Sequence, residues 1–211
     1  MRRLALIALP LGLALAPALY SAAPQAAGQP DASRVTAGTY LADPDHTMVS
    51  WRVNHMGFND YFGLFGNISG TLTIDPAKLD QAQVSVRVPI DRVLTPSKGL
   101  TQNLLTPGPG AERAKFFGDK PGDAVFTSTK VTPAADGKSA SIEGRLAMLG
   151  VTRPVTIAAT FAGAGKNPLL GKQTIGFHGT TRIRRSEWGI NGYIPLVGDE
   201  VTLEISAAFQ R

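Results

Sequence analysis

The sequence contains three histidines, and one of them stands where an apolar residue is expected. In "WRVNHMGF", residues 51–58, the two-residue period of a β-strand puts Trp51, Val53 and His55 on one face. An imidazole on an apolar face needs a hydrogen-bond partner. His55 is therefore a core histidine bonded to a backbone carbonyl or a neighbouring Asn, a contact for the polar group of a ligand, or a metal ligand. The sequence leaves these three roles open.

Metal chemistry has little further support. His46, His55 and His178 lack the i,i+2 or i,i+4 spacing of an evident metal site, although separate strands could still bring two of them together. The chain has no cysteine, which excludes disulfides, thiolate chemistry and cysteine-based metal sites. We expect no metal and no cofactor.

Motifs of catalysis are also missing. No G-x-S-x-G nucleophile elbow occurs, and "GPGAERAKFFG" lacks both the preceding strand and the Lys-Ser/Thr ending of a phosphate loop. Asp43 lies close to His46, but "DPD" at 43–45 is typical of a turn in which proline fixes the backbone. We expect a protein that is not an enzyme; a site assembled from distant strands, such as that of a hydrolase or isomerase for a lipid-like substrate, is the alternative.

The charge pattern does not indicate a nucleic-acid-binding protein. The formal charge of +5 falls to +3 when Arg2 and Arg3 are removed, and no basic face with interleaved aromatics is evident. One dense run, "RIRRSEWG" at 182–189, is interpreted as a solvated strand end.

The beginning of the chain predicts export. Residues 1–23 combine a positive start, an apolar run and small residues, which is typical of a secretory signal peptide. Pro10 and Pro17 interrupt that run, which disfavours a membrane anchor. We expect a flexible lead-in over 24–36, one domain over 37–211, and a periplasmic or secreted mature protein.

The period is two almost everywhere in that domain, which predicts an all-β fold of eight or nine antiparallel strands. Turn signals such as "DPAKLD", "AADGK" and "LVGDE" separate the strands. The connection over 97–118 breaks the rhythm and is expected to hold one or two short helices. The apolar stripes are Ile68–Ile74, Val84–Ile90, Val125–Val131, Ile142–Met148, Val155–Phe161, Ile175–Ile183 and Val201–Phe209.

Small residues within the stripes favour a barrel over a two-sheet sandwich, whose core needs bulky side chains to interdigitate. They either leave an internal volume unfilled or relieve the bending of the strands, and the sequence does not separate these explanations. An eight-stranded barrel is just wide enough to fill with side chains or to hold one small ligand. The residues concerned are Gly70, Gly144, Ala159, Gly179 and Ala207.

Five segments, taken in order, resemble the YceI-like family of polyisoprenoid-binding proteins. The resemblance implies an extended, lipocalin-like eight-stranded antiparallel barrel, periplasmic in bacteria, that sequesters a long isoprenoid or similar amphiphilic lipid in its lumen. The chain departs from the family pattern at Trp51 and Trp188, which replace Phe, and at Gly118, which replaces Asp; "LTPGPGAERAK" also looks longer than the usual loop. The matching segments are "YLADPDHTMVSWRVNHMGF", "GLFGNISGTLTID", "FFGDKPGDAVFTST", "GRLAMLGVTRPVTI" and "IRRSEWGINGYIPLVGDEVTLEISAAF".

Binding energetics explain why such a lumen would select long chains. A micromolar complex needs about 8 kcal/mol net, association costs about 4 to 15 kcal/mol more, and each buried CH₂ returns about 0.8 kcal/mol. A cargo of roughly fifteen to twenty-five apolar carbons follows from these values. The candidate ligand-binding residues are Trp51, Val53, His55, Phe58, Phe62, Phe65, Leu72, Phe116, Phe117, Leu146 and Trp188, with the 58–65 loop and the Phe116–Phe117 pair as the mouth.

Several partners fit this function. An isoprenoid-tailed quinone would satisfy the same lumen, so the chain could serve as an accessory module in membrane electron transfer. Transient contact with a membrane is compatible with either cargo. A homodimer is a further expectation, because open barrel edges can pair.

Overall fold

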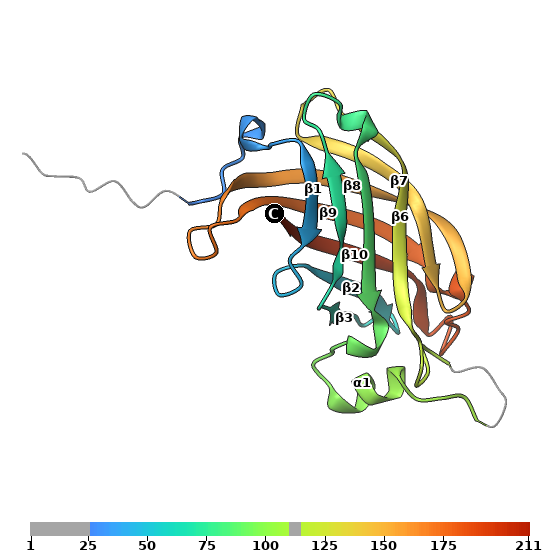
Figure 1. The fold of residues 1–211 in the computed structure, drawn as a ribbon. Helices are drawn as coiled ribbons and strands as arrows, with labels where there is room; N and C mark the ends of the chain where they lie inside the picture. The colour runs from blue at the N-terminus through green and yellow to red at the C-terminus, as the bar shows by residue number, and fades with distance from the viewer. Residues whose placement is uncertain (1–25, 110–114) are drawn as a thin grey trace, which may run out of the picture.

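A computed structural model describes residues 26–109 and 115–211 (Figure 1). The predicted signal peptide lies outside the described residues. Figure 1 shows a curved wall of long strands, with the one α-helix of the described residues below it. The elements are η1 (Ala32–Arg34), β1 (Gly38–Ala42), β2 (Met48–His55), β3 (Asn59–Phe65), β4 (Ser69–Ile74), η2 (Leu79–Gln81), β5 (Gln83–Pro89), η3 (Ile90–Arg92), α1 (Lys98–Leu104), β6 (Asp123–Pro133), β7 (Ser139–Met148), β8 (Val151–Lys166), β9 (Gln173–Arg184), η4 (Arg185–Trp188) and β10 (Val197–Gln210).

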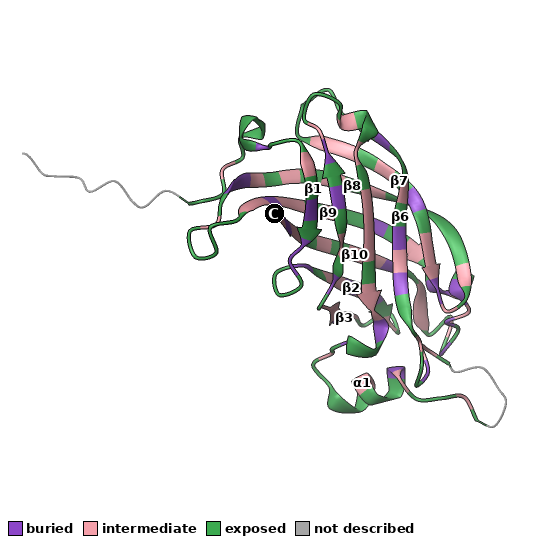
Figure 2. Cartoon of the chain, in the orientation of Figure 1, coloured by how far each residue is buried: buried purple, intermediate pink, exposed green. Residues whose placement is uncertain are grey.

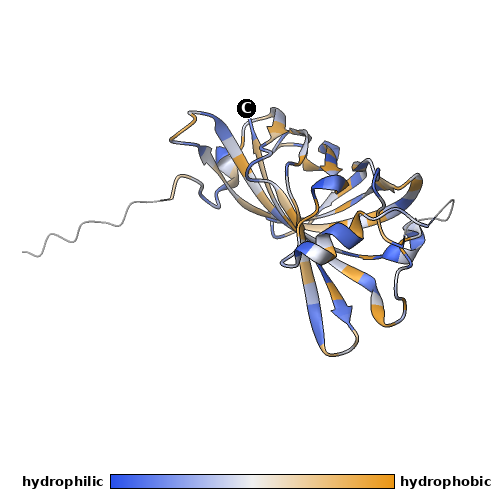
Figure 3. Cartoon of the chain, turned by 90° about the horizontal axis from the view of Figure 1, so that it is seen from below, coloured by the Kyte–Doolittle hydropathy of each residue, from blue (hydrophilic) through white to orange (hydrophobic). Residues whose placement is uncertain are grey.

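The strands form a closed antiparallel barrel with two extra strands. Hydrogen bonding follows the order β1-β4-β5-β6-β7-β8-β9-β10, and β10 returns to β1, which closes a ring of eight. β2 pairs with the first part of the same edge of β10 and carries β3 on its other side, so the hairpin β2–β3 supplies the two extra strands. Hydrophobic and hydrophilic residues alternate along the strands (Figure 3), as the period of two requires. The predicted all-β, eight-stranded barrel is confirmed.

Closure depends on β10, which pairs with two different strands along one edge. Its first part pairs with β2, from Val197–His55 to Ser206–Met48, and its end pairs with β1 at Phe209–Ala42. Between them the Thr47 hydroxyl donates to the Ala208 carbonyl at 3.0 Å and accepts the Ala208 N–H at 3.1 Å. β1 and β2 therefore occupy one strand position that a turn interrupts.

That turn is the predicted "DPD" segment. Asp43 is buried, and its carboxylate accepts the backbone N–H of Asp45 at 3.1 Å and lies 2.8 Å from Nδ1 of His46. The His46 and Thr47 backbone N–H groups donate to the Asp43 carbonyl. The pairing of Asp43 with His46 is thus part of turn geometry, as the sequence indicates.

The described part of the 97–118 connection, residues 97–109 and 115–118, contains one short α-helix, in agreement with the prediction. Ser97 caps α1 by accepting the backbone N–H of Leu100 at 3.2 Å, and Leu104 is buried on the helix face that meets β2. Over the described residues no helix has the length and hydrophobicity to cross a bilayer.

The described part of the expected lead-in, residues 26–36, makes specific contacts with the barrel. Gln29 exchanges two backbone hydrogen bonds with Ala164, at 2.9 and 3.0 Å. Val35 is buried in the cluster that contains Tyr40 and Phe209. The domain boundaries themselves remain a prediction.

Arg185 corrects the interpretation of "RIRRSEWG" as a solvated strand end. Its guanidinium is buried and donates to four backbone carbonyls at 2.8 to 2.9 Å, those of Ile190, Gly192, Val197 and Gly198. Burial lowers the pKa of Arg185, but its neighbour Asp199 opposes this shift, and arginine stays protonated in proteins. This one side chain fastens the loop between η4 and β10.

We expect Arg185→Met to destabilise the fold by about 3–5 kcal/mol, because four buried or partly buried carbonyls lose a charged donor at once. Arg184→Met is the matched control: Arg184 is exposed, so its replacement is expected to change stability by less than about 0.5 kcal/mol. Urea unfolding followed by far-UV circular dichroism measures both. Equal effects of the two variants would contradict the fastening role.

Candidate functional site

A cavity of about 650 Å³ occupies the barrel interior. Well-packed protein cores contain few voids larger than a water molecule, so a volume of this size is not a packing defect but a feature of the fold. At one end it is lined by His55, Met56 and Tyr193, and at the other by Gln83 and Lys138. The cavity therefore runs through the barrel from one end to the other.

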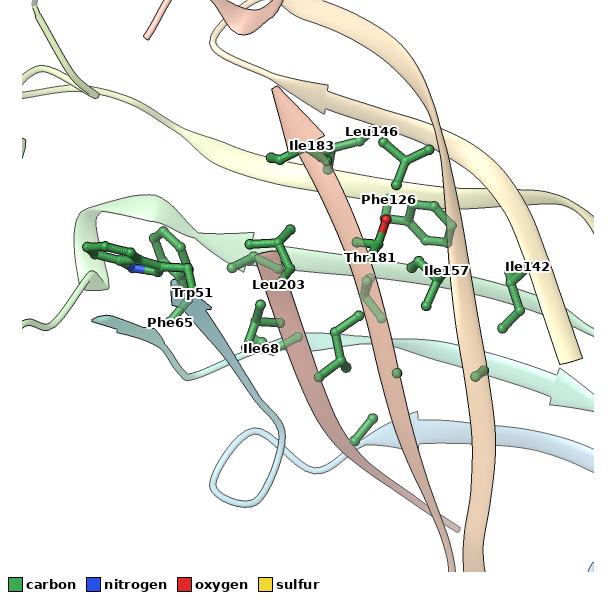
Figure 4. Close-up of a pocket in the computed structure, with 18 of the residues that line it drawn as sticks. Trp51, Phe65, Ile68, Phe126, Ile142, Leu146, Ile157, Thr181, Ile183 and Leu203 are labelled. Carbon is green, nitrogen blue, oxygen red and sulfur yellow. The ribbon is translucent and has the colours of Figure 1, made fainter. Parts of the chain in front are cut away.

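The middle of the cavity wall is hydrocarbon. In Figure 4 side chains from β6 to β10 point into one common space; the labelled ones on these strands are Phe126, Ile142, Leu146, Ile157, Thr181, Ile183 and Leu203. Thr181 is the polar member, and its hydroxyl donates to the Thr156 carbonyl at 2.8 Å. The wall thus satisfies its own hydroxyl and presents an apolar surface to the lumen.

Partial exposure of inward side chains shows that the interior is hollow. Ile142, Ile157 and Ile205 face inward, yet each is only half-buried. Figure 2 shows long stretches of such intermediate burial along the strands. Buried apolar residues fall into three separate clusters instead of one continuous core. The lumen predicted from the sequence is present.

Some of the small residues leave space in the cavity, as the first of the two explanations requires, and others have a packing role that the sequence did not predict; relief of bending stays a prediction. Ala159, Gly179 and Ala207 line the cavity, where a larger side chain would take up space. Gly70 and Gly144 instead allow close packing: a Cβ would lie 2.3 Å from the Ser85 carbonyl oxygen at Gly70, and 2.4 Å from the Phe126 ring at Gly144.

Most of the candidate ligand-binding residues face this cavity. Phe65 and Phe117 meet edge to face with ring centroids 5.9 Å apart, so they close the side of the cavity next to α1. Whether any of these residues contacts a ligand remains a prediction. The candidates that line the cavity are Trp51, Val53, His55, Phe65, Leu72, Phe116, Phe117 and Leu146.

Phe58 and Phe62 do not line the cavity. Residues 59–65 form a strand and not the predicted loop, and its register pairs Trp51 with Gly63 and Arg52 with Phe62. Because faces alternate, Phe62 points outward with Arg52, and its side chain is exposed. Phe58 lies in the tight β2–β3 turn and is 87% exposed.

Trp188 does not line the cavity either. It is 1% exposed and packs with Met148 and Val155 behind the lumen wall. Its indole N–H donates to the Leu146 carbonyl at 3.3 Å. Position 188 thus joins the η4 turn to β7 and has a structural role in the wall.

Trp51 packs flat against a glycine on the neighbouring strand. A Cβ added at Gly63 would lie 2.2 Å from the indole ring, so only glycine leaves room for this ring. Trp51 Nε1 is buried against Gly63 and has no hydrogen-bond partner among the described residues. The ring also stacks on Tyr61, with centroids 6.4 Å apart.

His55 lies at the end of this aromatic row. It is half-buried, lines the cavity, and its ring centroid lies 6.2 Å from that of Tyr61. No hydrogen bond joins its ring to another described residue, so the expected bond to a backbone carbonyl or a neighbouring Asn is absent from the described structure. A free imidazole at a cavity end is placed to meet a polar ligand group.

The histidines do not form a metal centre within the described ranges. His46 and His178 are exposed. No group of three His, Cys, Asp or Glu side chains suited to a metal ion occurs among residues 26–109 and 115–211. The metal alternative for His55 therefore has no support in the described part of the chain.

Sequence reasoning missed most of the lumen wall on β8 to β10. Ile157, Ile183 and Leu203 line the cavity, and their stripes were visible as period-two patterns. A pattern shows that one face is apolar, but it does not tell an occupied core from a vacant lumen.

A family model describes the chain from residue 40 to residue 209 as a YceI-like domain. The chain belongs to the YceI-like family. A UPF0312 protein of Pseudomonas fluorescens is 35% identical over 164 residues, which cover 75% of this chain and 79% of the relative. The family model begins in β1 and ends in β10, so it spans the barrel.

Solved structures share this fold. Burkholderia cenocepacia BcnA matches with a TM-score of 0.66 at 23% identity, covering 79% of this chain and 98% of that one. A polyisoprenoid binding domain from Saccharophagus degradans, implicated in plant cell wall breakdown, matches with a TM-score of 0.55 at 10% identity, covering 81% and 97%. At these identities the likeness establishes the fold alone.

We expect Gly63→Ala to destabilise the protein by about 1–3 kcal/mol, because the added methyl group collides with the Trp51 ring. In a Trp51→Leu background the collision is gone, and the cost of Gly63→Ala is expected to fall below about 1 kcal/mol. A double-mutant cycle of unfolding free energies measures the coupling. Additive effects would show that the ring does not depend on the glycine.

Proposed function

We propose that the protein binds a long, largely hydrocarbon lipid of the isoprenoid type inside the barrel. The observation that carries this proposal is the apolar cavity, which runs through the barrel and in the middle of whose wall the Thr181 hydroxyl is already hydrogen-bonded. A binding role is favoured over catalysis because the side chains that would meet the cargo are aliphatic or aromatic along most of the lumen.

Cavity size agrees with a long chain. A methylene group takes up nearly the volume of a water molecule, about 30 Å³, so a lumen of about 650 Å³ holds roughly twenty chain carbons. Twenty buried carbons return about 16 kcal/mol at about 0.8 kcal/mol each, which exceeds the cost of association and gives micromolar or better affinity where that cost is about 8 kcal/mol or less. A ten-carbon acid would fill half of the lumen and bind weakly.

The fold relationship supports an isoprenoid in particular. The Saccharophagus degradans domain is a polyisoprenoid binding domain, and it shares the barrel over 81% of this chain. An isoprenoid-tailed quinone meets the same physical requirements. We therefore propose the isoprenoid tail as the recognised part and treat the head group as a second question.

We place the head group at the His55 end. The unbonded imidazole there can donate to or accept from a polar atom, whereas the middle of the lumen offers only hydrocarbon. The cargo then lies with its tail along β6 to β10 and its polar end near the β2–β3 turn. This orientation needs no charged residue inside the lumen.

We further propose that the mature protein works outside the cytoplasm as a carrier. Support comes from the signal-like pattern of residues 1–23 and from the absence of cysteine in the sequence. Subcellular fractionation with detection of the processed N-terminus tests the location.

Protein purified from its native host without detergent should carry one lipid per chain in native mass spectrometry. Ala159→Trp is expected to lower the affinity about 100-fold, because the new ring displaces about four chain carbons from the lumen. Ala158→Trp is the matched control: Ala158 is the adjacent residue on the outer face and is exposed. An empty lumen in repeated preparations, or equal effects of the two variants, would contradict lumenal binding.

His55→Leu separates a ligand contact from a structural role. Since His55 makes no hydrogen bond to the described residues, we expect its replacement to change the unfolding free energy by less than about 1 kcal/mol. Loss of one head-group hydrogen bond is expected to weaken binding by about three- to ten-fold. Thermal unfolding and lipid titration measure the two effects; lower stability with unchanged binding would assign His55 to the fold.

A further inference from the structure

Four large apolar side chains are exposed together at one end of the barrel. Two belong to the β2–β3 turn and two to the loop before β10, and the Met56 N–H donates to the Leu196 carbonyl at 2.8 Å, which joins the two segments. We call this set the apolar rim: Met56, Phe58, Tyr193 and Leu196, with exposed fractions of 46%, 87%, 49% and 61%.

Both segments of the apolar rim lack formal charge. No Asp, Glu, Lys or Arg occurs in residues 53–59 or in residues 188–198. Hairpin tips usually carry small polar residues. A phenylalanine exposed to water at such a tip is energetically unfavourable, and its transfer to an apolar environment is favourable. Scattered exposed hydrophobics are normal, but a joined, uncharged group is a feature of interaction sites.

The apolar rim borders the cavity. Met56 and Tyr193 line the lumen and are also exposed to solvent. At each of these positions a single side chain therefore lies between the lumen and the solvent. The opposite end is different, because Gln83, Lys138 and Ser139 line the cavity there. Among the described residues, the apolar rim therefore joins the lumen to the surface through the side chains of Met56 and Tyr193.

A basic side chain stands beside the apolar rim. Nζ of Lys115 lies 5.4 Å from the centroid of the Tyr193 ring, and the Gly192 N–H donates to the Lys115 carbonyl at 2.8 Å. Tyrosine with an adjacent lysine suits the boundary between acyl chains and head groups, where the ring is half buried and the ammonium reaches the phosphates.

We propose that the apolar rim inserts into one leaflet of a lipid bilayer and that cargo passes between bilayer and lumen at this end. A bilayer is favoured over a protein partner because the exposed group lies on two turn segments and combines apolar side chains with a flanking lysine. The passage of cargo rests on the proposed function, whereas insertion of the rim does not.

Vesicle co-sedimentation tests the insertion. Wild-type protein should pellet with vesicles of phosphatidylethanolamine and phosphatidylglycerol, and the double variant Phe58→Ser, Leu196→Ser should partition at least about ten-fold more weakly. The matched control is Leu169→Ser, Leu170→Ser, which removes two leucines that are 91% and 55% exposed on the β8–β9 turn. This control should pellet like the wild type.

A fluorescence measurement locates the contact. Both native tryptophans are buried, so an indole introduced by Phe58→Trp reports on the rim. Its emission should shift to the blue when vesicles are added. Absence of wild-type pelleting, an equal loss in the leucine control, or no spectral shift would overturn the proposal. Self-association of the wild type that the Phe58→Ser, Leu196→Ser variant abolishes, without vesicles, would also overturn it and assign the rim to a second copy.

Lipid binding in detergent solution tests whether the lumen binds cargo, independently of whether the apolar rim inserts into a bilayer. Phe58 and Leu196 do not line the cavity, so their serine variant should bind solubilised cargo as the wild type does, while transfer of cargo from donor vesicles slows at least about ten-fold. Unchanged transfer would overturn passage at the rim. Failure of every variant to bind cargo would instead refute the proposed function, and the pelleting result would still decide insertion.

Discussion

The hollow interior depends on hydrogen bonds that are made within the barrel wall and not across the lumen. Ring closure pairs the backbone through β10, which bonds with β9 on one side and with β2 and β1 on the other. The Thr181 hydroxyl donates to a carbonyl within the wall, and the Arg185 guanidinium donates to four backbone carbonyls. Two exceptions among the described residues are Trp51 Nε1, which is buried without a hydrogen-bond partner, and the His55 ring, which lies at one end of the lumen.

An unfilled volume of this size makes stability depend on the cargo. Cavities in protein cores lower stability in proportion to their volume, so a lumen of about 650 Å³ lowers the stability of the empty protein relative to one with a filled interior. Whole domains are stable by only about 5–15 kcal/mol. An apolar chain that occupies the lumen restores the missing contacts and stabilises the native state by mass action. The free energy of unfolding therefore rises when cargo is bound and falls when it is released.

Strand periodicity in the sequence correctly predicted which face of most strands is apolar. It did not predict features that depend on the register between strands or on contacts distant in the sequence. Val53 and Leu146 face the lumen, as their stripes predict, and the resemblance supplied the closed barrel. Phe62 was misplaced because its face depends on the register of β3 against β2, which the apolar character of the residue does not reveal. Arg185 was misjudged because its acceptors lie five to thirteen residues further along the chain, beyond any local pattern.

Closure of the ring also limits how two copies could pair through strands. β3 is the strand left outside the ring within the described residues, and its free side offers an edge to another chain. Part of that edge is already used, because Leu64 and Leu94 exchange two backbone hydrogen bonds at 2.8 and 2.9 Å. A partner strand would have to displace the 93–95 segment, in which Val93 is buried against the Trp51 cluster. Strand addition would therefore disturb the wall next to the cavity, so a dimer that keeps the lumen intact would have to form through side chains on another face.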